Sequence, residues 1–333
     1  MADGAQKSRH RPQAWAFPAN PVVARLPVDP RRGVQRGMAH KPAAPGDVAA
    51  RALKALLGDI VSEARKPLET PDVSDEVVVH DLRKAFKRWR ALLRLVAPTV
   101  GAEADALRIE ARDLAREIAI ARDTRAMLDA VADLGEEELS ARTRASIGER
   151  LGRIGASAEA ASLTEDLRSR LREAVARATV AVDRWPTDRF DIPEATRQLT
   201  AGYRRARAAI PEDWASAPPE ALHRLRQRVV IHRYQMELAD TVWPRFIRLW
   251  IAEAQRLRDR LGAHHDLVTL RHLVGPHQAL APWRSRLTPL IALREAEHSA
   301  AAQRLAGRLF AERPRAFRQR IEALWEHRAD RST

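Results

Sequence analysis

The sequence predicts an all-α protein. Helix-forming Ala, Leu, Arg and Glu dominate the composition, aromatic residues make up only 5% and Gly numbers only 14, and no stretch alternates polar and apolar residues for the length of a strand. Hydrophobic residues form 45% of the 333 residues, which is enough for a substantial core. This length predicts one large domain or two of ordinary size.

Residues 1–45 differ from the rest of the chain. They are rich in Pro, Arg and small residues and have no sustained helical period. Such a composition predicts a disordered basic extension. Met38 offers an alternative start of the chain. We therefore expect the folded part to span residues 46–328.

Apolar residues recur at spacings of three and four from Gly46 onward, and this first predicted helix ends before Pro67. Ser74 and Asp75 are candidate N-caps of a second helix, and Pro98 is expected to stop it. The same pattern predicts further helices over about 102–134, 159–182, 193–210, 218–242, 244–273, 283–309 and 315–328.

The second predicted helix has an unbalanced positive face. At about 100° per residue, five of its basic side chains fall within roughly one quarter of the circumference: His80, Arg83, Lys87, Arg90 and Arg94. Lys84 and Arg88 add charge, and no acid follows Asp81 up to Val96. A solvated helix usually mixes both signs, so this face predicts an anionic ligand.

Overall charge supports an anionic partner. The formal net charge is +14 and the pI is near 11.1, as expected for a protein that binds nucleic acid, an acidic membrane surface or a polyanionic polymer. The absence of Cys excludes disulfides, Cys-ligated metals and thiol catalysis, and it fits a reducing cytoplasm. No apolar run is long enough to span a bilayer, so no membrane partner is expected.

The chain matches itself at an offset of 143 residues. His80, Arg83 and Arg90 fall on His223, Arg226 and Arg233, and in the same frame Asp123 falls on Asp266. Chance would rarely align a His, two Arg and a distant Asp. We therefore expect two equivalent modules, 46–190 and 191–328. Four-helix bundles related by a pseudo-twofold axis would direct both His/Arg faces into one shared basic cavity.

These residues resemble a known family. His80-x-x-Arg83-x-x-x-Lys87-Arg88-x-Arg90 is similar to the signature of the CHAD domain, the conserved histidine α-helical domain. Four further segments resemble its second copy, its two later motifs and its preceding basic helix: His223-x-x-Arg226 with Arg233-Tyr234, Arg122-Asp123, Leu261-Gly262 with Asp266, and Tyr203-Arg204-Arg205-Ala206-Arg207. The resemblance covers residues 46–328.

The resemblance implies two four-helix bundles beside a basic pore that binds inorganic polyphosphate, often at polyphosphate granules. The implied binding residues are His80, Arg83, Lys84, Lys87, Arg88, Arg90, Arg94, Arg204, Arg205, Arg207, His223, Arg226 and Arg233. Both histidines could instead be satisfied by a backbone group or a carboxylate. Asp123 and Asp266 are expected to hold arginines in structural ion pairs.

The second copy departs from the first. Val230 and Glu237 stand where the first copy has Lys87 and Arg94, and Arg228 lies at an offset that points away from the His223 face. We therefore expect the first copy to carry most of the binding.

Other functions are less well supported. The sequence has none of the motifs GxGxxG, GxxxxGK[ST], GxSxG and HExxH, so we expect a non-catalytic module that needs no cofactor. Adjacent histidines on a helix diverge, so His264-His265-Asp266 predicts no metal site. The alternatives are a nucleic-acid-binding helical protein or a phosphotransferase or phosphatase acting on polyphosphate. The sequence predicts no particular oligomeric state.

Overall fold

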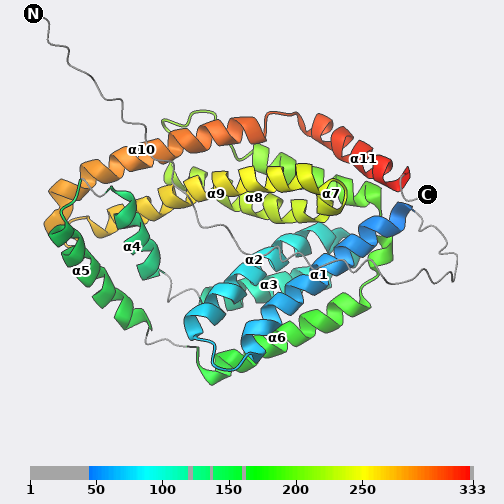
Figure 1. The fold of residues 1–333 in the computed structure, drawn as a ribbon, viewed down its shortest axis with the longest axis horizontal. Coiled ribbons are helices and arrows are strands. Elements are labelled where there is room, and N and C mark those ends of the chain that lie inside the picture. The colour runs from blue at the N-terminus through cyan, green and yellow to red at the C-terminus, as the bar shows by residue number, and fades with distance from the viewer. Residues whose placement is uncertain (1–44, 119–122, 136–137, 160–162, 331–333) are drawn as a thin grey trace, which may run out of the picture. The chain divides into compact units, whose positions relative to one another are not determined.

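A computed structural model describes residues 45–118, 123–135, 138–159 and 163–330. In these ranges the chain forms eleven α-helices and short 3-10 turns and contains no strand, which confirms the predicted all-α class (Figure 1). The helices are α1 (Pro45–Glu69), α2 (Asp75–Val100), α3 (Ala102–Glu117), α4 (Asp123–Asp133), α5 (Ala141–Glu159), α6 (Glu165–Arg184), α7 (Ile192–Arg207), α8 (Pro219–Met236), α9 (Pro244–Leu273), α10 (Arg284–Leu309) and α11 (Pro314–Asp330). Among the described helices, none is apolar over a length that would cross a bilayer.

Most helices lie where the sequence predicts them. The expected helix over 102–134 is divided into α3 and α4. The predicted extension over 1–45 lies outside the described residues, apart from Pro45. Helix α5 was not predicted at all. Pro67 and Pro98 lie inside the last turns of α1 and α2 instead of stopping them. A proline so close to the end removes only one backbone bond, and α2 ends at Gly101, whose φ of 86° favours glycine.

Two hydrophobic cores hold the helices together. The larger core takes side chains from α1, α2, α3, α6, α7, α8, the first part of α9, the end of α10 and α11. The smaller core lies between α4, α5, the second part of α9 and the first part of α10. Both cores therefore join helices from the two halves of the sequence, and α9 and α10 run through both.

Helix α2 lies at the centre of the larger core. It packs against α1, α3, α7 and α8, and its apolar side chains Leu82, Phe86, Trp89 and Leu93 are buried. Burial of this side fixes the rotation of the helix about its axis. The basic residues of α2 are thereby held on its remaining surface.

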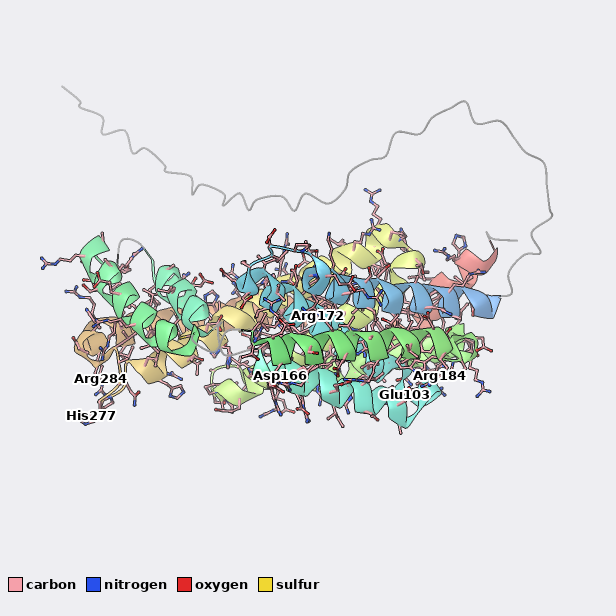
Figure 2. The ribbon with its side chains drawn as sticks, turned by 90° about the horizontal axis from the view of Figure 1, so that it is seen from below. Glu103, Asp166, Arg172, Arg184, His277 and Arg284 are labelled. Carbon is pink, nitrogen blue, oxygen red and sulfur yellow. The ribbon has the colours of Figure 1, made fainter. Side chains whose placement is uncertain are left out.

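Polar contacts at the end of α6 attach it to the start of α3. Glu103 accepts a hydrogen bond from Trp185 Nε1 at 2.9 Å and forms an ion pair with Arg184 (Figure 2). Trp185 also stacks on Trp89 of α2, with ring centroids 6.0 Å apart. These contacts hold the end of α6 against α3 and α2.

Candidate anion-binding site

The basic residues of α2 lie at different depths. His80 and Lys84 are exposed, whereas Arg83, Lys87, Arg90 and Arg94 are half-buried. Arg94 Nη1 donates to the backbone oxygen of Arg90 at 2.7 Å, which fixes its guanidinium along the helix. Arg90 Nε is buried and has no hydrogen-bond partner among the described residues.

Arg88 lies apart from this face, because it forms two ion pairs. Its Nε and Nη2 donate to Glu237 Oε2 at 3.0 and 2.8 Å, and its Nη1 donates to Glu63 at 2.5 Å. The Arg88 side chain is only 12% exposed. Burial raises the pKa of the Glu237 carboxyl, and the charge of Arg88 offsets part of this rise. Arg88 thus joins α2 to α1 and to the 3-10 turn η3 (Glu237–Thr241) that follows α8.

Arginines from four helices converge near Arg94. The pKa of the Arg94 guanidinium is lowered to about 10, first by burial and then by the charges of Arg108 on α3, Arg90, Arg228 on α8 and Arg205 on α7. Burial likewise lowers the pKa of Arg205, with Arg228 as the strongest neighbouring charge. Among the described residues, Arg94, Arg205 and Arg228 form no ion pair with an acid. The cationic surface therefore extends beyond the face predicted from α2.

The arginines of α3 were not predicted from the sequence. Burial lowers the pKa of Arg90, and the charges of Arg108, Arg112 and Arg116 add to this effect. Asp105 pairs with Arg108 at 2.8 Å, and Asp113 pairs with Arg112 and Arg116 at 2.8 and 3.5 Å. Residues spaced by four lie on one side of a helix, so this row could have been identified from the sequence. Arg228 could not, because only the packing of α8 on α2 brings it near Arg94.

A histidine of α8 lies beside a histidine of α9. The rings of His223 and His265 have centroids 4.4 Å apart, and burial, with the charge of Arg226, lowers the pKa of both. The Gln227 amide donates to His223 Nε2 at 2.8 Å, so the ring proton of neutral His223 is on Nδ1. Nδ1 is buried without a partner among the described residues. Arg226 lies against Gly262 of α9, where an added Cβ would be 3.4 Å from its Nε.

The three arginines predicted on α7 do not share one direction. Arg204 and Arg205 are both exposed, and Arg205 lies near Arg228. Arg207 Nε donates to the backbone oxygen of Phe310 at 3.1 Å, at the end of α10. Arg233 of α8 lies over the ring of Tyr234, 3.9 Å from its centroid. Only Arg205 among these residues contributes to the cluster around Arg94.

The predicted structural acids are only partly described. Arg122 and the side chain of Asp123 lie outside the described residues, and Asp266 is half-buried on α9. Within the described part of the chain, no group of three or more His, Cys, Asp or Glu side chains is arranged to hold a metal ion.

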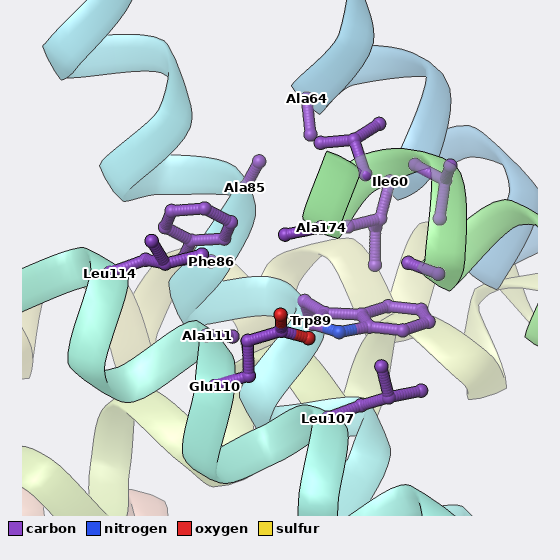
Figure 3. A pocket seen from close by; sticks show the side chains of 13 residues that line it. Ile60, Ala64, Ala85, Phe86, Trp89, Leu107, Glu110, Ala111, Leu114 and Ala174 are labelled. Atoms are coloured by element: carbon purple, nitrogen blue, oxygen red, sulfur yellow. The ribbon is translucent and has the colours of Figure 1, made fainter. Parts of the chain in front are cut away.

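An apolar cavity lies between α1, α2, α3 and α6 (Figure 3). Its volume is about 30 Å³, and its lining includes Trp89, Phe86, Ala111 and Ala174, with Glu110 as the polar exception. Glu110 is paired with Arg177 at 2.5 Å. The cavity has room for only a water-sized group and lacks convergent polar groups, so it is not the anion site.

Comparisons with known proteins identify the family. A family model described as the CHAD domain matches residues 51–275. A crystal structure of the CHAD domain from the plant Ricinus communis has the same fold: the two chains are 19% identical, the alignment covers 80% of this chain and 92% of that one, and the TM-score is 0.52. No curated protein matches the sequence. The all-helical architecture and the family match together establish that this chain belongs to the CHAD domain family.

Proposed function

We propose that the protein binds inorganic polyphosphate on the cationic surface formed by α2, α3, α7 and α8. The observation that carries the proposal is the convergence of Arg108, Arg205 and Arg228 on Arg94, because four helices contribute positive charge to one place. Such a concentration of guanidinium groups is favourable only opposite an anion. Membership of the CHAD family supports polyphosphate as that anion.

The spacing of the α2 residues suits an extended polyanion. Positions three and four apart on a helix recur at steps of about 5 Å, so Arg83, Lys87, Arg90 and Arg94 form a ladder along one side. Arg can clamp phosphate oxygens with two parallel hydrogen bonds, and Lys acts as a point charge. Release of counterions from the polymer would make the binding strongly salt dependent, by analogy with nucleic acids. Arg88 has a structural role in this proposal, because Glu237 and Glu63 already neutralise it.

We further propose that the folded part consists of two equivalent halves, 46–190 and 191–328, around a shared basic cavity. The 143-residue offset places α7 on α1, α8 on α2, α9 on α3 and α4, α10 on α5, and α11 on α6. Arg286 Nη1 donates to Thr143 Oγ1, its own counterpart, at 3.3 Å. Gln235 Nε2 donates to the oxygen of Ala91, one residue from the matching position, at 3.2 Å. Contacts between counterparts are expected beside a twofold axis and so support this arrangement.

The same proposal makes the protein a binding module located at polyphosphate granules, not an enzyme. The cationic face of α2 offers no carboxylate that could hold Mg²⁺ or act as a base, which phosphoryl transfer requires. Nucleic acid is the second candidate ligand, because it presents the same phosphate charge.

A competition assay tests the proposal. Labelled long-chain polyphosphate is bound at physiological salt and challenged with duplex and single-stranded DNA. We expect neither DNA to displace it at equal phosphate concentration. Arg83→Gln/Lys87→Gln should weaken polyphosphate binding by more than tenfold while helical content stays unchanged by circular dichroism.

Two results would overturn the proposal. Displacement by DNA at equal phosphate concentration would favour the nucleic-acid function. Release of phosphate or shortening of the polymer with Mg²⁺ or Mn²⁺ would instead establish an enzyme.

A further inference from the structure

The first half of α9 has a face that is open to solvent. Exposed residues recur along it at spacings of three and four, at Arg245, Leu249, Ala252 and Arg256. Leu249 is 63% exposed, more than any other large apolar side chain in the described chain. The centre of this face is therefore apolar, which is unusual for a helix surface that only meets water.

Two aromatic side chains border the exposed face of α9. Trp243, immediately before the helix, is 49% exposed and stacks on the half-buried Phe246, with ring centroids 5.2 Å apart. The guanidinium carbon of Arg320 on α11 lies 4.9 Å from the centre of the Phe246 ring and holds it from the other element. Aromatic residues and Arg are enriched at protein interfaces. The composition of this surface therefore favours a protein partner.

The charges on this face are mostly neutralised, with one exception. Arg248 is paired with Asp240 at 2.9 Å, and Arg256 is paired with Glu253 at 2.7 Å. Arg245 is exposed and forms no ion pair in the described part of the protein. Glu253 keeps 31% of its side chain exposed, and a carboxylate accepts from more than one donor. One unpaired cation and one accessible acid thus remain on the same face.

These two charges lie symmetrically about Leu249. Arg245 is four residues before it and Glu253 four residues after it, which is about 6 Å in each direction along the helix axis. Rows of side chains spaced by four are the ridges that pack most often between helices. If two copies of this row meet antiparallel at Leu249, Arg245 of each copy lies opposite Glu253 of the other. Phe246 then lies opposite the small Ala252, whereas a parallel arrangement would set Arg245 against Arg245.

We propose that the protein forms a symmetric dimer through the exposed face of α9, with Leu249 on the twofold axis. The twofold symmetry forms the contact between Arg245 and Glu253 twice. A contact between two single helices is smaller than the roughly 800 Å² per partner of a stable complex, so the dimer is weak. We expect a dissociation constant of about 10 µM. The dimer is independent of the proposed function, because none of these side chains belongs to the anion site.

The test measures the mass of the full chain by sedimentation velocity from about 1 to 200 µM, a range that spans the expected dissociation constant. Arg245→Glu and Glu253→Arg each place like charges opposite one another, and each should weaken the dimer by at least a factor of about ten. An equal mixture of the two variants should restore dimers of wild-type strength, because both contacts of the mixed dimer again join opposite charges. Arg142→Glu is the matched control: it reverses the charge of an exposed arginine on α5 and should dimerise like the wild type.

A second pair of variants tests the apolar centre of the interface. Leu249→Ala should weaken the dimer roughly tenfold, since both copies lose buried apolar surface. Leu293→Ala on α10, where the side chain is 56% exposed, should leave it unchanged. A wild type that stays monomeric over the whole concentration range would leave this face to a different partner and overturn the proposal. A dimer that Leu249→Ala does not weaken, or a mixture of the two charge variants that stays monomeric, would also overturn it.

Discussion

Trp89 on α2 and His232 on α8 stand 143 residues apart, yet their surroundings differ sharply. Trp89 borders the apolar cavity, whose lining includes the small residues Ala85, Ala111 and Ala174 (Figure 3). His232 is fully buried among four aromatic rings, from Tyr203, Trp250, Phe310 and Phe317. The surroundings of Trp89 are thus loosely packed, and those of His232 are tightly filled.

The charges differ in the same sense. Arg94 lies near Arg108, Arg205 and Arg228 and has no acidic partner in the described chain, whereas Glu237, 143 residues further on, is an acid paired with Arg88. The comparison predicts that the packed surroundings of His232 and the Glu237–Arg88 pair contribute more to stability than the surroundings of Trp89 and Arg94.

The largest expected effect comes from removing a buried ring from the aromatic group around His232. Phe317 is fully buried and stacks on Tyr203 with centroids 4.2 Å apart. Phe317→Ala should lower the free energy of unfolding by about 4 kcal/mol, because it creates a cavity where the first half has Ala174. Urea denaturation measures the change. Phe246→Ala, at a half-buried ring, should cost about 1 kcal/mol. Equal losses would mean that the aromatic group is not a centre of stability.

Next in size is the ion pair between Glu237 and Arg88. Glu237→Ala leaves Arg88 without its main partner at a site where only 12% of the Arg88 side chain is exposed. We expect a loss of about 3 kcal/mol in unfolding free energy. A double-mutant cycle with Arg88→Ala measures the coupling directly. A coupling near zero would show that the charge difference between the halves has no structural role.

His232 should make the second half sensitive to acid. Burial, followed by the charge of Arg205, lowers the pKa of His232 to about 3, below the value of about 6.5 in the unfolded chain. The unfolded state therefore binds a proton first, and stability falls as the pH drops below 6.5. His232 should account for about 2 kcal/mol of the loss between pH 7 and 5.

His232→Phe should remove that part of the pH dependence in urea denaturation at the two pH values. Other histidines with lowered pKa, His223, His264 and His265, remain in both proteins and cancel in the comparison. An identical pH dependence of variant and wild type would show that the pKa of His232 in the folded protein is close to its unfolded value and that the ring is not buried in solution.

The smallest effect should come from filling the apolar cavity beside Trp89. Ala174→Val adds two methyl groups toward the cavity and should raise the unfolding free energy by about 1 kcal/mol. The same substitution at the fully buried Ala254 of the second half should instead cost about 2 kcal/mol through overpacking. Destabilisation at both positions would mean that the cavity is too small or too rigid to be filled.

The sequence analysis predicted the helices that have a clear apolar side and missed one that has not. Helix α5 contains Gly148 and Gly152, and its buried residues Ile147 and Leu151 are too few for a recognisable period. It is helical because α4, α9 and α10 complete the core around it. The division between α3 and α4 was likewise missed, since Leu107, Leu114 and Leu128 continue one apolar spacing across it.

For the candidate site, the sequence alone determined the all-helical class, the family resemblance and the unbalanced charge of α2, because these depend on composition and on neighbours within one helix. Only the tertiary structure decided which charges remain available. Glu237 neutralises Arg88 from 149 residues away, and Arg228, which the helical wheel directs away from the His223 face, lies near Arg94. An electrostatic environment depends on distances between helices, and the packing of α8 against α2 sets those distances.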